Sequence, residues 1–222
     1  FGIKYLYQEK TIFSLFNVAV LLNFIHVGTM MVGLPYLFKE VLMVNSKLYG
    51  FAQSIFPAGA LIGALVMNFL PEIKKFYRTF IIMCSIQGIL FIFIGIPLFP
   101  SILAVYPKMN IYLILLIFLL ITGISNAVIN IPISVLLQRL IPDNLRGRVF
   151  GLLSSLSQGL VPLSMALVGF LLDYSPSYYL FIGTGFSTLV LVITMTKISS
   201  LRKLDQENQD LENQNNTLVG GV

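Results

Sequence analysis

Charged residues are scarce in this chain, and their scarcity excludes a soluble globular protein. Only 10% of the 222 residues are Asp, Glu, Lys or Arg, whereas 57% are hydrophobic. A soluble domain carries roughly a quarter charged residues, which its surface needs in order to stay in water. The composition therefore indicates an integral membrane protein.

The residues that hydrolytic and metal-dependent enzymes use are also missing. His26 is the only histidine, and Cys84 is the only cysteine, inside an apolar run where we expect a buried thiol and no disulfide within the chain. The apolar runs hold no Asp or Glu except Asp173 at the end of the fifth, and the chain has no Walker A or G-x-S-x-G sequence. We therefore predict that the protein is not an enzyme and needs no metal ion or other cofactor.

Long apolar runs are what the sequence has in abundance. Six of them stand out, at 12–38, 48–70, 79–99, 111–138, 149–172 and 178–198. Each reaches the roughly 20 helical residues that cross a hydrocarbon core of about 30 Å. The sequence therefore predicts an all-α membrane protein, a bundle of six transmembrane helices.

The two ends of the chain differ from this bundle. We expect residues 1–11 to form a short cytoplasmic segment, 12–198 the bundle, and 199–222 a polar cytoplasmic tail. The tail is rich in Asn, Gln, Glu and Asp, which is typical of disorder, but leucines at seven-residue spacing leave an oligomerising helix open. Because Phe1 stands where an initiator Met would, we expect the chain to be part of a longer protein.

The distribution of positive charge predicts the orientation. One side of a six-span bundle would hold eleven of the 14 Lys and Arg residues, namely Lys4, Lys10, Lys74, Lys75, Arg78, Arg139, Arg146, Arg148, Lys197, Arg202 and Lys203. The other side would hold Lys39, Lys47 and Lys108. Because Lys and Arg favour the cytoplasmic side, we expect a multi-pass protein of the cytoplasmic membrane with both termini in the cytoplasm. The net charge of +5 then reflects orientation, and we expect no nucleic-acid partner.

The fourth run carries a line of polar side chains. Thr122, Asn126, Asn130, Ser134 and Gln138 recur at every fourth residue. Each step of four advances about 400° around a helix, so the five side chains form one slowly winding stripe. Polar groups at bilayer depth need partners or water, because an unsatisfied group costs several kcal/mol. The stripe therefore faces either another helix or a cavity.

Other uncharged polar residues lie in the first, second and fifth runs. Asn23, His26 and Met30 share one face of the first helix, while Gln53 lies in the second run and Gln158 in the fifth. For each of them, hydrogen bonding between helices and a place on the wall of a substrate pathway both stay open. Our candidates for the pathway are Asn23, His26, Met30, Gln53, Thr122, Asn126, Asn130, Ser134 and Gln158.

A basic turn joins the fourth and fifth runs. The residues of this cytoplasmic motif are Arg139, Asp143, Arg146, Gly147 and Arg148. The charges could simply mark the cytoplasmic side of the protein. Alternatively, Arg146 and Arg148 could hold a carboxylate in one conformation and release it in another, because Arg forms fixed bidentate pairs with acids. Glu72 and Asp143 are the nearest acidic candidates along the chain.

Glycines and prolines predict how the helices pack and bend. Gly59 and Gly63 form a G-x-x-x-G pair in the second run, and such small residues let helix backbones approach. We expect the same of the glycines in the fifth run, Gly147, Gly151, Gly159 and Gly169. Prolines remove a backbone donor and allow bends, which we expect at Pro57, Pro97, Pro132 and Pro162.

Over about residues 5–198 the chain resembles the C-terminal half of a major facilitator superfamily transporter. The connection NIPISVLLQRLIPDNLRGRVFGLLSSLSQGLVPL is similar to a string in macrolide and multidrug exporters, with Gln, then Pro, then Arg-Gly-Arg at the cytoplasmic start of the eleventh span. The segment GALVMNFLPEIKKFYR stands where the family's Gly/Asp/Arg loop motif would recur. Its Gly63 and the following cations match that motif, but the usual Asp is missing.

The resemblance implies spans seven to twelve of twelve, arranged as two inverted three-helix repeats. The first, second, fourth and fifth spans would line the pathway, and the third and sixth would face lipid. Family members rock two six-helix halves around a midplane site, so the implied partners are an N-terminal half, membrane lipid, a small-molecule substrate and protons. The neutral polar wall suits an amphipathic substrate, and the resemblance implies proton-coupled antiport in drug- or macrolide-like efflux.

Two other functions stay open at this point. The chain could be a self-contained six-span protein that acts as a homodimeric channel or carrier. It could also be a membrane scaffold or sensor that does not transport and whose tail recruits a partner.

Overall fold

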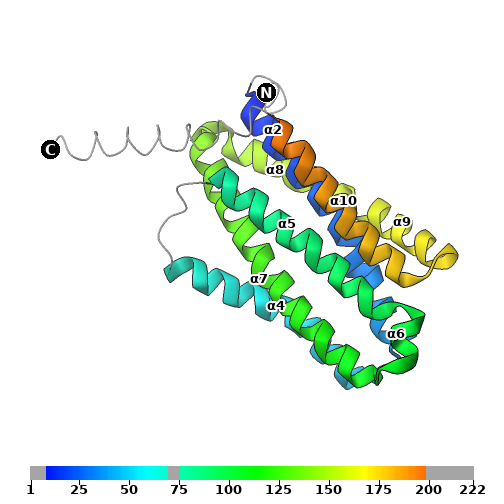
Figure 1. Cartoon of the computed structure of the whole chain (residues 1–222). Helices are drawn as coiled ribbons and strands as arrows, with labels where there is room; N and C mark the ends of the chain where they lie inside the picture. The colour runs from blue at the N-terminus through cyan, green and yellow to red at the C-terminus, as the bar shows by residue number, and fades with distance from the viewer. Residues whose placement is uncertain (1–8, 70–75, 199–222) are drawn as a thin grey trace.

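The structure is a computed structural model of the chain, and it describes residues 9–69 and 76–198. Within these residues, six helices are long and apolar enough to cross a membrane (Figure 1). They run over Thr11–Val41, Ser46–Phe69, Phe76–Leu98, Lys108–Leu140, Asp143–Tyr174 and Ser177–Lys197. The expected all-α bundle of six spans is therefore confirmed. Our expectations for the tail at 199–222 and for the first eight residues lie outside the described residues.

The first span changes its winding along its length. It consists of α2 (Lys10–Gly28), the π-helical turn η1 (Thr29–Gly33), α3 (Leu34–Tyr36) and a second π-helical turn η2 (Leu37–Val41). Pro35 has no N–H to donate to the preceding turn, which accounts for the widened turn before it. We did not expect a break at Pro35. It lies directly after the part of the first span that bears Asn23, His26 and Met30.

The other spans are more regular. They are α4 (Ser46–Phe69), α5 (Phe76–Gly95) with the 3-10 turn η3 (Ile96–Leu98), α7 (Lys108–Leu140), α8 (Asp143–Gly159) followed by α9 (Val161–Tyr174), and α10 (Ser177–Lys197). A short helix, α6 (Pro100–Val105), connects the third span to the fourth. Pro97 ends a span and Pro162 begins α9 after a break at Leu160, whereas Pro57 and Pro132 lie inside unbroken helices.

Three pairs of spans have the most extensive contacts, which are α4 with α7, α5 with α10, and α2 and η1 with α8 and α9, while α5 also packs against α7. In span numbers these are the second with the fourth, the third with the sixth, and the first with the fifth. Exchanging the first three spans with the last three maps this set of pairs onto itself. Because each group has three spans, the second group enters the membrane from the opposite side, as inverted repeats require.

Glycines bring two of these pairs into backbone contact. A Cβ on Gly123 of α7 would overlap the Phe56 carbonyl oxygen of α4 and lie 3.1 Å from the Gly59 Cα. Gly88 of α5 and Gly185 of α10 face each other in the same way. The glycines of the fifth span do not behave as expected, because a Cβ on any of them would meet no described atom within 4 Å. These are Gly147, Gly151, Gly159 and Gly169.

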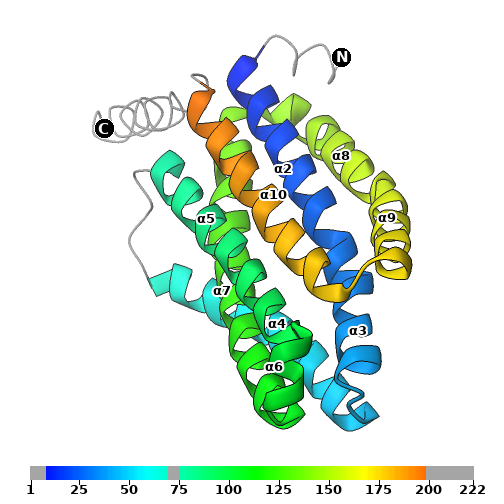
Figure 2. The same ribbon diagram turned by 45° about the vertical axis from the view of Figure 1, so that its right-hand side comes forward.

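Two large apolar cores lie toward opposite ends of the bundle, and a smaller cluster joins α9 to α10 through Val168, Leu172 and Leu180. Figure 2 shows the helices that contribute to them. The first gathers side chains from the start of α2 and α5 and the end of α7, such as Leu15, Phe80 and Leu137. The second lies around α3 and the start of α7, with Phe38 and Leu115 as fully buried members. Between the two cores, the facing sides of the helices carry polar side chains.

Candidate functional site

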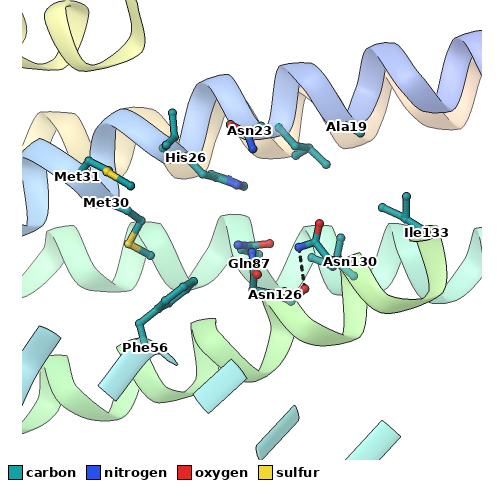
Figure 3. Close-up of a pocket in the computed structure, with 13 residues that line it drawn as sticks. Ala19, Asn23, His26, Met30, Met31, Phe56, Gln87, Asn126, Asn130 and Ile133 are labelled. Carbon is teal, nitrogen blue, oxygen red and sulfur yellow. Dashed lines mark hydrogen bonds between the residues drawn. The ribbon is translucent and has the colours of Figure 1, made fainter. Parts of the chain in front are cut away.

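A cavity of about 290 Å³ lies between the two cores, with walls from α2, η1, α4, α5 and α7 (Figure 3). Its polar lining residues are Asn23, His26, Gln87, Asn126 and Asn130. Its apolar lining includes Met30, Met31 and Phe56. Among the described residues no charged side chain lines it. The volume is near the lower limit of small-molecule sites, which begin at about 300 Å³.

Five of the nine sequence-predicted pathway residues meet in this cavity. They are Asn23, His26 and Met30 from the first span and Asn126 and Asn130 from the fourth. These two groups are about a hundred residues apart in the sequence. Asn23 and Asn130 are exposed and lie at the mouth, and the Asn130 amide donates to the Asn126 carbonyl at 2.9 Å. The first and fourth spans therefore supply most of the polar wall.

The remainder of the polar stripe on α7 does not reach the cavity. Thr122 is fully buried, and its hydroxyl donates to the Phe118 carbonyl at 2.7 Å. Ser134 is exposed and does not line the cavity. Each step of four residues overshoots a full turn by about 40°, so Thr122 and Ser134 point in directions about 120° apart. Only the middle members, Asn126 and Asn130, face the cavity.

The polar residues of the second and fifth spans also lie elsewhere. The Gln53 amide donates to the Tyr49 hydroxyl at 2.6 Å within α4. Gln158 is exposed on α8, and no residue of the fifth span lines the cavity. The third span, in contrast, contributes Gln87. Within this chain the cavity walls therefore differ from those that the resemblance implied, in which the fifth span lines the pathway and the third faces lipid.

Gln87 is the site residue that sequence reasoning missed. Its side chain is 3% exposed, and it makes no hydrogen bond in the part of the chain that the structure describes. Figure 3 shows it reaching from α5 into the cavity, on the side opposite α2. The available signal was a lone amide within an apolar helix of 20 residues. An amide at this depth needs a hydrogen-bond partner or water. The presence of Gln87 therefore indicated a polar environment around α5, which the periodicity of the sequence did not reveal.

His26 both lines the cavity and bonds to another helix. Its Nε2 lies 2.9 Å from the Thr188 hydroxyl of α10, and its ring stacks on Phe91 with centroids 4.9 Å apart. Thr188 in turn donates to the Thr184 carbonyl at 2.8 Å, and the Thr184 hydroxyl lies 2.8 Å from that of Thr29. His26 therefore makes a hydrogen bond between helices and also lines the cavity.

Ser164 of α9 joins the first and fifth spans in an unusual way. Its hydroxyl donates to the Phe24 carbonyl at 2.6 Å and accepts the Gly28 N–H at 3.0 Å. Phe24 and Gly28 are four residues apart, the spacing of a helical hydrogen bond. One side chain of α9 thus satisfies two backbone groups of α2, one turn from the cavity-lining Met30.

The basic turn is closed by Arg146. Its guanidinium lies 2.6 Å from the Asp143 carboxylate and donates to the Gln138 carbonyl at 2.6 Å. It thereby ties the start of α8 to the last turn of α7, where unpaired carbonyls favour a cation. The fifth span begins at Asp143, so Gly147 and Arg148 lie in its first turns and are exposed. The other acidic candidate, Glu72, lies outside the described residues.

Sequence comparison adds one finding. A family model described as Major Facilitator Superfamily matches residues 16–218. No curated protein and no solved structure gives a significant match. The matched range includes most of the first span and all of the other five.

Proposed function

The chain belongs to the major facilitator superfamily, a family of membrane transporters rather than enzymes, and from this premise we propose that it forms the C-terminal half of a secondary transporter. The complete protein moves a small amphipathic compound across the cytoplasmic membrane by alternating access. We assign it to proton-coupled efflux of drug- or macrolide-like compounds. The observation that carries this proposal is the neutral polar cavity between the two apolar cores.

The chemistry of the cavity favours an amphipathic substrate. Amides and one imidazole offer hydrogen bonds, while Met30, Met31 and Phe56 offer apolar and polarisable contact. No charged side chain lines the cavity within the described residues, so a strongly charged metabolite would enter without a counter-ion. For the same reason we place any acid that couples transport to protons in the other half of the protein.

Two outer faces support a partner half of the same kind. Only 17% of the most apolar stretch of the second and fifth spans is buried, against 44% for the third and fourth. These two spans also expose polar groups, including Ser54 and Asn68 on α4 and Ser154 and Gln158 on α8. Polar groups facing hydrocarbon are costly. A second protein surface against both spans would cover them and add the wall that the cavity lacks.

The described charges agree with the proposed orientation. The start of α5, the end of α7, the start of α8 and the end of α10 lie at one end of the bundle, and the start of α4 and the start of α7 lie at the other (Figure 2). The first set of helix ends carries Arg78, Arg139, Arg146, Arg148 and Lys197, whereas Lys39, Lys47 and Lys108 belong to the second end. Positive residues favour the cytoplasm, so we assign the first end to the cytoplasmic side. The Arg146 turn then lies at the cytoplasmic surface. There it could exchange its partner for an acid of the other half during transport.

Drug accumulation tests the proposed function directly. Cells that express the full-length protein containing this chain should accumulate less of a macrolide or an amphipathic dye than cells without it. A protonophore should abolish the difference, because it removes the proton gradient. Unchanged accumulation of every compound in a broad panel would sink the efflux proposal. A difference that survives the protonophore would remove proton coupling alone.

Two α7 variants test the cavity as the transport site. Asn130→Leu removes an amide at the cavity mouth, and we expect about a fivefold lower initial transport rate, the equivalent of one hydrogen bond of about 1 kcal/mol. Ser134→Ala is the matched control, because Ser134 lies one turn further on and does not line the cavity. Equal rates for the Asn130→Leu variant and the parent would remove Asn130 from the site.

The same outer faces would also fit a second copy of this chain. Crosslinking in native membranes separates the two cases. A stable homodimer with no further partner would favour a self-contained six-span channel or carrier. Crosslinks from α4 and α8 to a six-span domain of the same polypeptide would favour the transporter half.

A further inference from the structure

We propose that His26 and Gln87 form one recognition point that selects substrates carrying an O–H or N–H donor, and that Thr188 sets this preference by fixing the tautomer of His26. The inference rests on the proposed transport function and names the substrate chemistry of its cavity. Thr188 does not line the cavity, so its role is to position His26.

The hydrogens of the Thr188 hydroxyl network determine which nitrogen of His26 carries a proton. The Thr188 hydroxyl has one hydrogen, and two acceptors lie within its reach, the Thr184 carbonyl at 2.8 Å and Nε2 of His26 at 2.9 Å. When this hydrogen goes to the Thr184 carbonyl, the Thr188 oxygen accepts toward His26 and Nε2 is the donor of that pair. In our proposal the network takes this arrangement, and His26 is the Nε2–H tautomer.

The second ring nitrogen is then a bare acceptor. A charged imidazolium would be costly here, since no Asp or Glu of the described residues lines the cavity to balance it. In the neutral Nε2–H form, Nδ1 carries a lone pair and no hydrogen. It has no hydrogen-bond partner within residues 9–69 and 76–198, and it is not among their fully buried, unsatisfied atoms. Nδ1 therefore remains free to accept a hydrogen bond from a bound molecule.

Gln87 points to a ligand independently of His26. Its side chain is 97% buried, reaches into the cavity from α5, and has no hydrogen-bond partner among the described residues (Figure 3). Its amide atoms are not among the fully buried, unsatisfied atoms of the described residues, so they are open to the cavity and can bond to a molecule that the cavity holds. Its NH₂ group can donate to the same substrate oxygen that donates its hydrogen to Nδ1. An alcohol or phenol satisfies both residues, whereas an ether satisfies only Gln87.

The ring of His26 is held firmly enough to express this preference. Phe91 stacks on its face with a centroid distance of 4.9 Å and an interplanar angle of 17°, and Thr188 holds its edge. Phe91 and Thr188 are both fully buried. A fixed acceptor discriminates better than a mobile one, because it cannot turn away from a substrate that lacks the donor.

Binding of a matched pair of compounds tests the proposal. The probes are 2-naphthol and its methyl ether, 2-methoxynaphthalene, measured by equilibrium dialysis with the full-length protein in lipid nanodiscs. We expect the parent to bind 2-naphthol about tenfold more tightly than the ether, the value of one well-placed hydrogen bond to a neutral group. Equal affinities for the two probes, or no binding of either, would overturn the proposal.

Three variants separate the roles of the residues. Thr188→Val keeps the shape but frees the imidazole to change tautomer, so the preference should fall to about twofold or less, and Thr188→Ser should restore it. Gln87→Leu should weaken the binding of both probes and leave the ratio of their affinities unchanged. Thr194→Val is the control, because Thr194 is exposed on the same helix and its hydroxyl donates to the Leu191 carbonyl at 2.7 Å, its one hydrogen bond among the described residues. An unchanged preference in the Thr188→Val variant would refute the positioning role.

A spectroscopic measurement tests the tautomer without any ligand. The ¹⁵N spectrum of histidine-labelled protein, assigned by comparison with the His26→Asn variant, should show His26 protonated at Nε2 and bare at Nδ1. The Thr188→Val variant should show a mixture of tautomers. The opposite tautomer in the parent would overturn the proposal even if transport were demonstrated. If the parent protein showed the expected tautomer and probe preference but did not transport any compound in cells, that result would instead count against the proposed function.

Discussion

The α4–α7 pair and the α2–α9 pair are interchanged when the two three-span groups of the bundle are exchanged, yet they are joined by different chemistry. In α4–α7 the backbones touch through Gly59, Gly63 and Gly123, and the side-chain hydrogen bond between them, from Tyr112 to the Leu48 carbonyl, lies near one end. In α2–α9 the contact is centred on Ser164, whose hydroxyl bonds to two backbone groups of α2.

The difference shows which part of the bundle can change partners. Backbone contacts between glycines depend on shape alone, and shape leaves no alternative partner. Hydroxyl groups can both donate and accept, so they can exchange one partner for another at small cost. The hydroxyl-rich contacts of the first span with α9 and α10 border His26, whereas none of the three glycines of α4–α7 lines the cavity. We therefore infer that the first span is the adjustable element and that α4–α7 is a fixed frame.

The largest expected effect is on the fixed frame. Gly123→Ala places a Cβ where it overlaps the Phe56 carbonyl oxygen and approaches the Ala60 nitrogen to 2.9 Å. Because neither helix backbone can yield without losing its other contacts, we expect the free energy of unfolding to fall by about 2 kcal/mol. Reversible unfolding in mixed micelles measures this change.

The matched control for this variant is Gly169→Ala in α9. A Cβ at Gly169 meets no described atom within 4 Å, and Ala favours a helix over Gly. Its free energy of unfolding should therefore not decrease. Similar losses in the two variants would show that glycine acts through chain flexibility rather than through close helix contact.

An intermediate effect is expected at Ser164. Ser164→Ala removes both hydrogen bonds to α2, but the Phe24 carbonyl and the Gly28 N–H can then bond to each other. We expect the free energy of unfolding to fall by about 1 kcal/mol, which is less than the decrease expected for Gly123→Ala. The same unfolding measurement applies. A loss above that of Gly123→Ala would reverse the assignment of fixed and adjustable contacts.

The smallest effect is expected at Thr184. Thr184→Val removes the hydroxyl that lies 2.8 Å from that of Thr29, and Thr29 retains the Ile25 carbonyl at 3.4 Å as an alternative acceptor. We expect the free energy of unfolding to fall by about 0.6 kcal/mol, the average contribution of a hydrogen bond between membrane helices. Combining Thr184→Val with Ser164→Ala should give the sum of the two losses. A clearly larger loss would mean that the two contacts form one cooperative network.

The fold followed from the sequence because the membrane imposes it. Each span needs about 20 apolar residues with all backbone groups bonded inside one helix, and the six runs satisfied that requirement visibly. The breaks were harder to foresee. Pro35 is followed by no change in hydropathy, so nothing separated the widened turns of the first span from an ordinary helix.

The site was partly predictable because the first and fourth spans carry polar residues on recognisable faces. A helix face is known from spacing, but the direction in which it points depends on tertiary packing. Thr122 and Ser134 thus belong to the same polar stripe as Asn126 and Asn130, but the stripe winds around α7 and carries these two side chains away from the cavity wall. Gln87 is not part of a periodic polar pattern. The only signal for it was the unfavourable free energy of placing an amide in hydrocarbon. The hydroxyls of Thr188 and Ser164 were hidden because single Ser and Thr residues are common in membrane helices.

The two apolar cores above and below the cavity have a further consequence. Each core packs fully buried side chains toward one end of the bundle, such as Leu15 in the first core and Phe38 in the second. In the described part of the chain, the cavity therefore lies between two well-packed regions. The exposed Asn23 and Asn130 mark a lateral window. In the alternating-access mechanism that we propose, access to the cavity from either side of the membrane depends on the protein surface that covers this window.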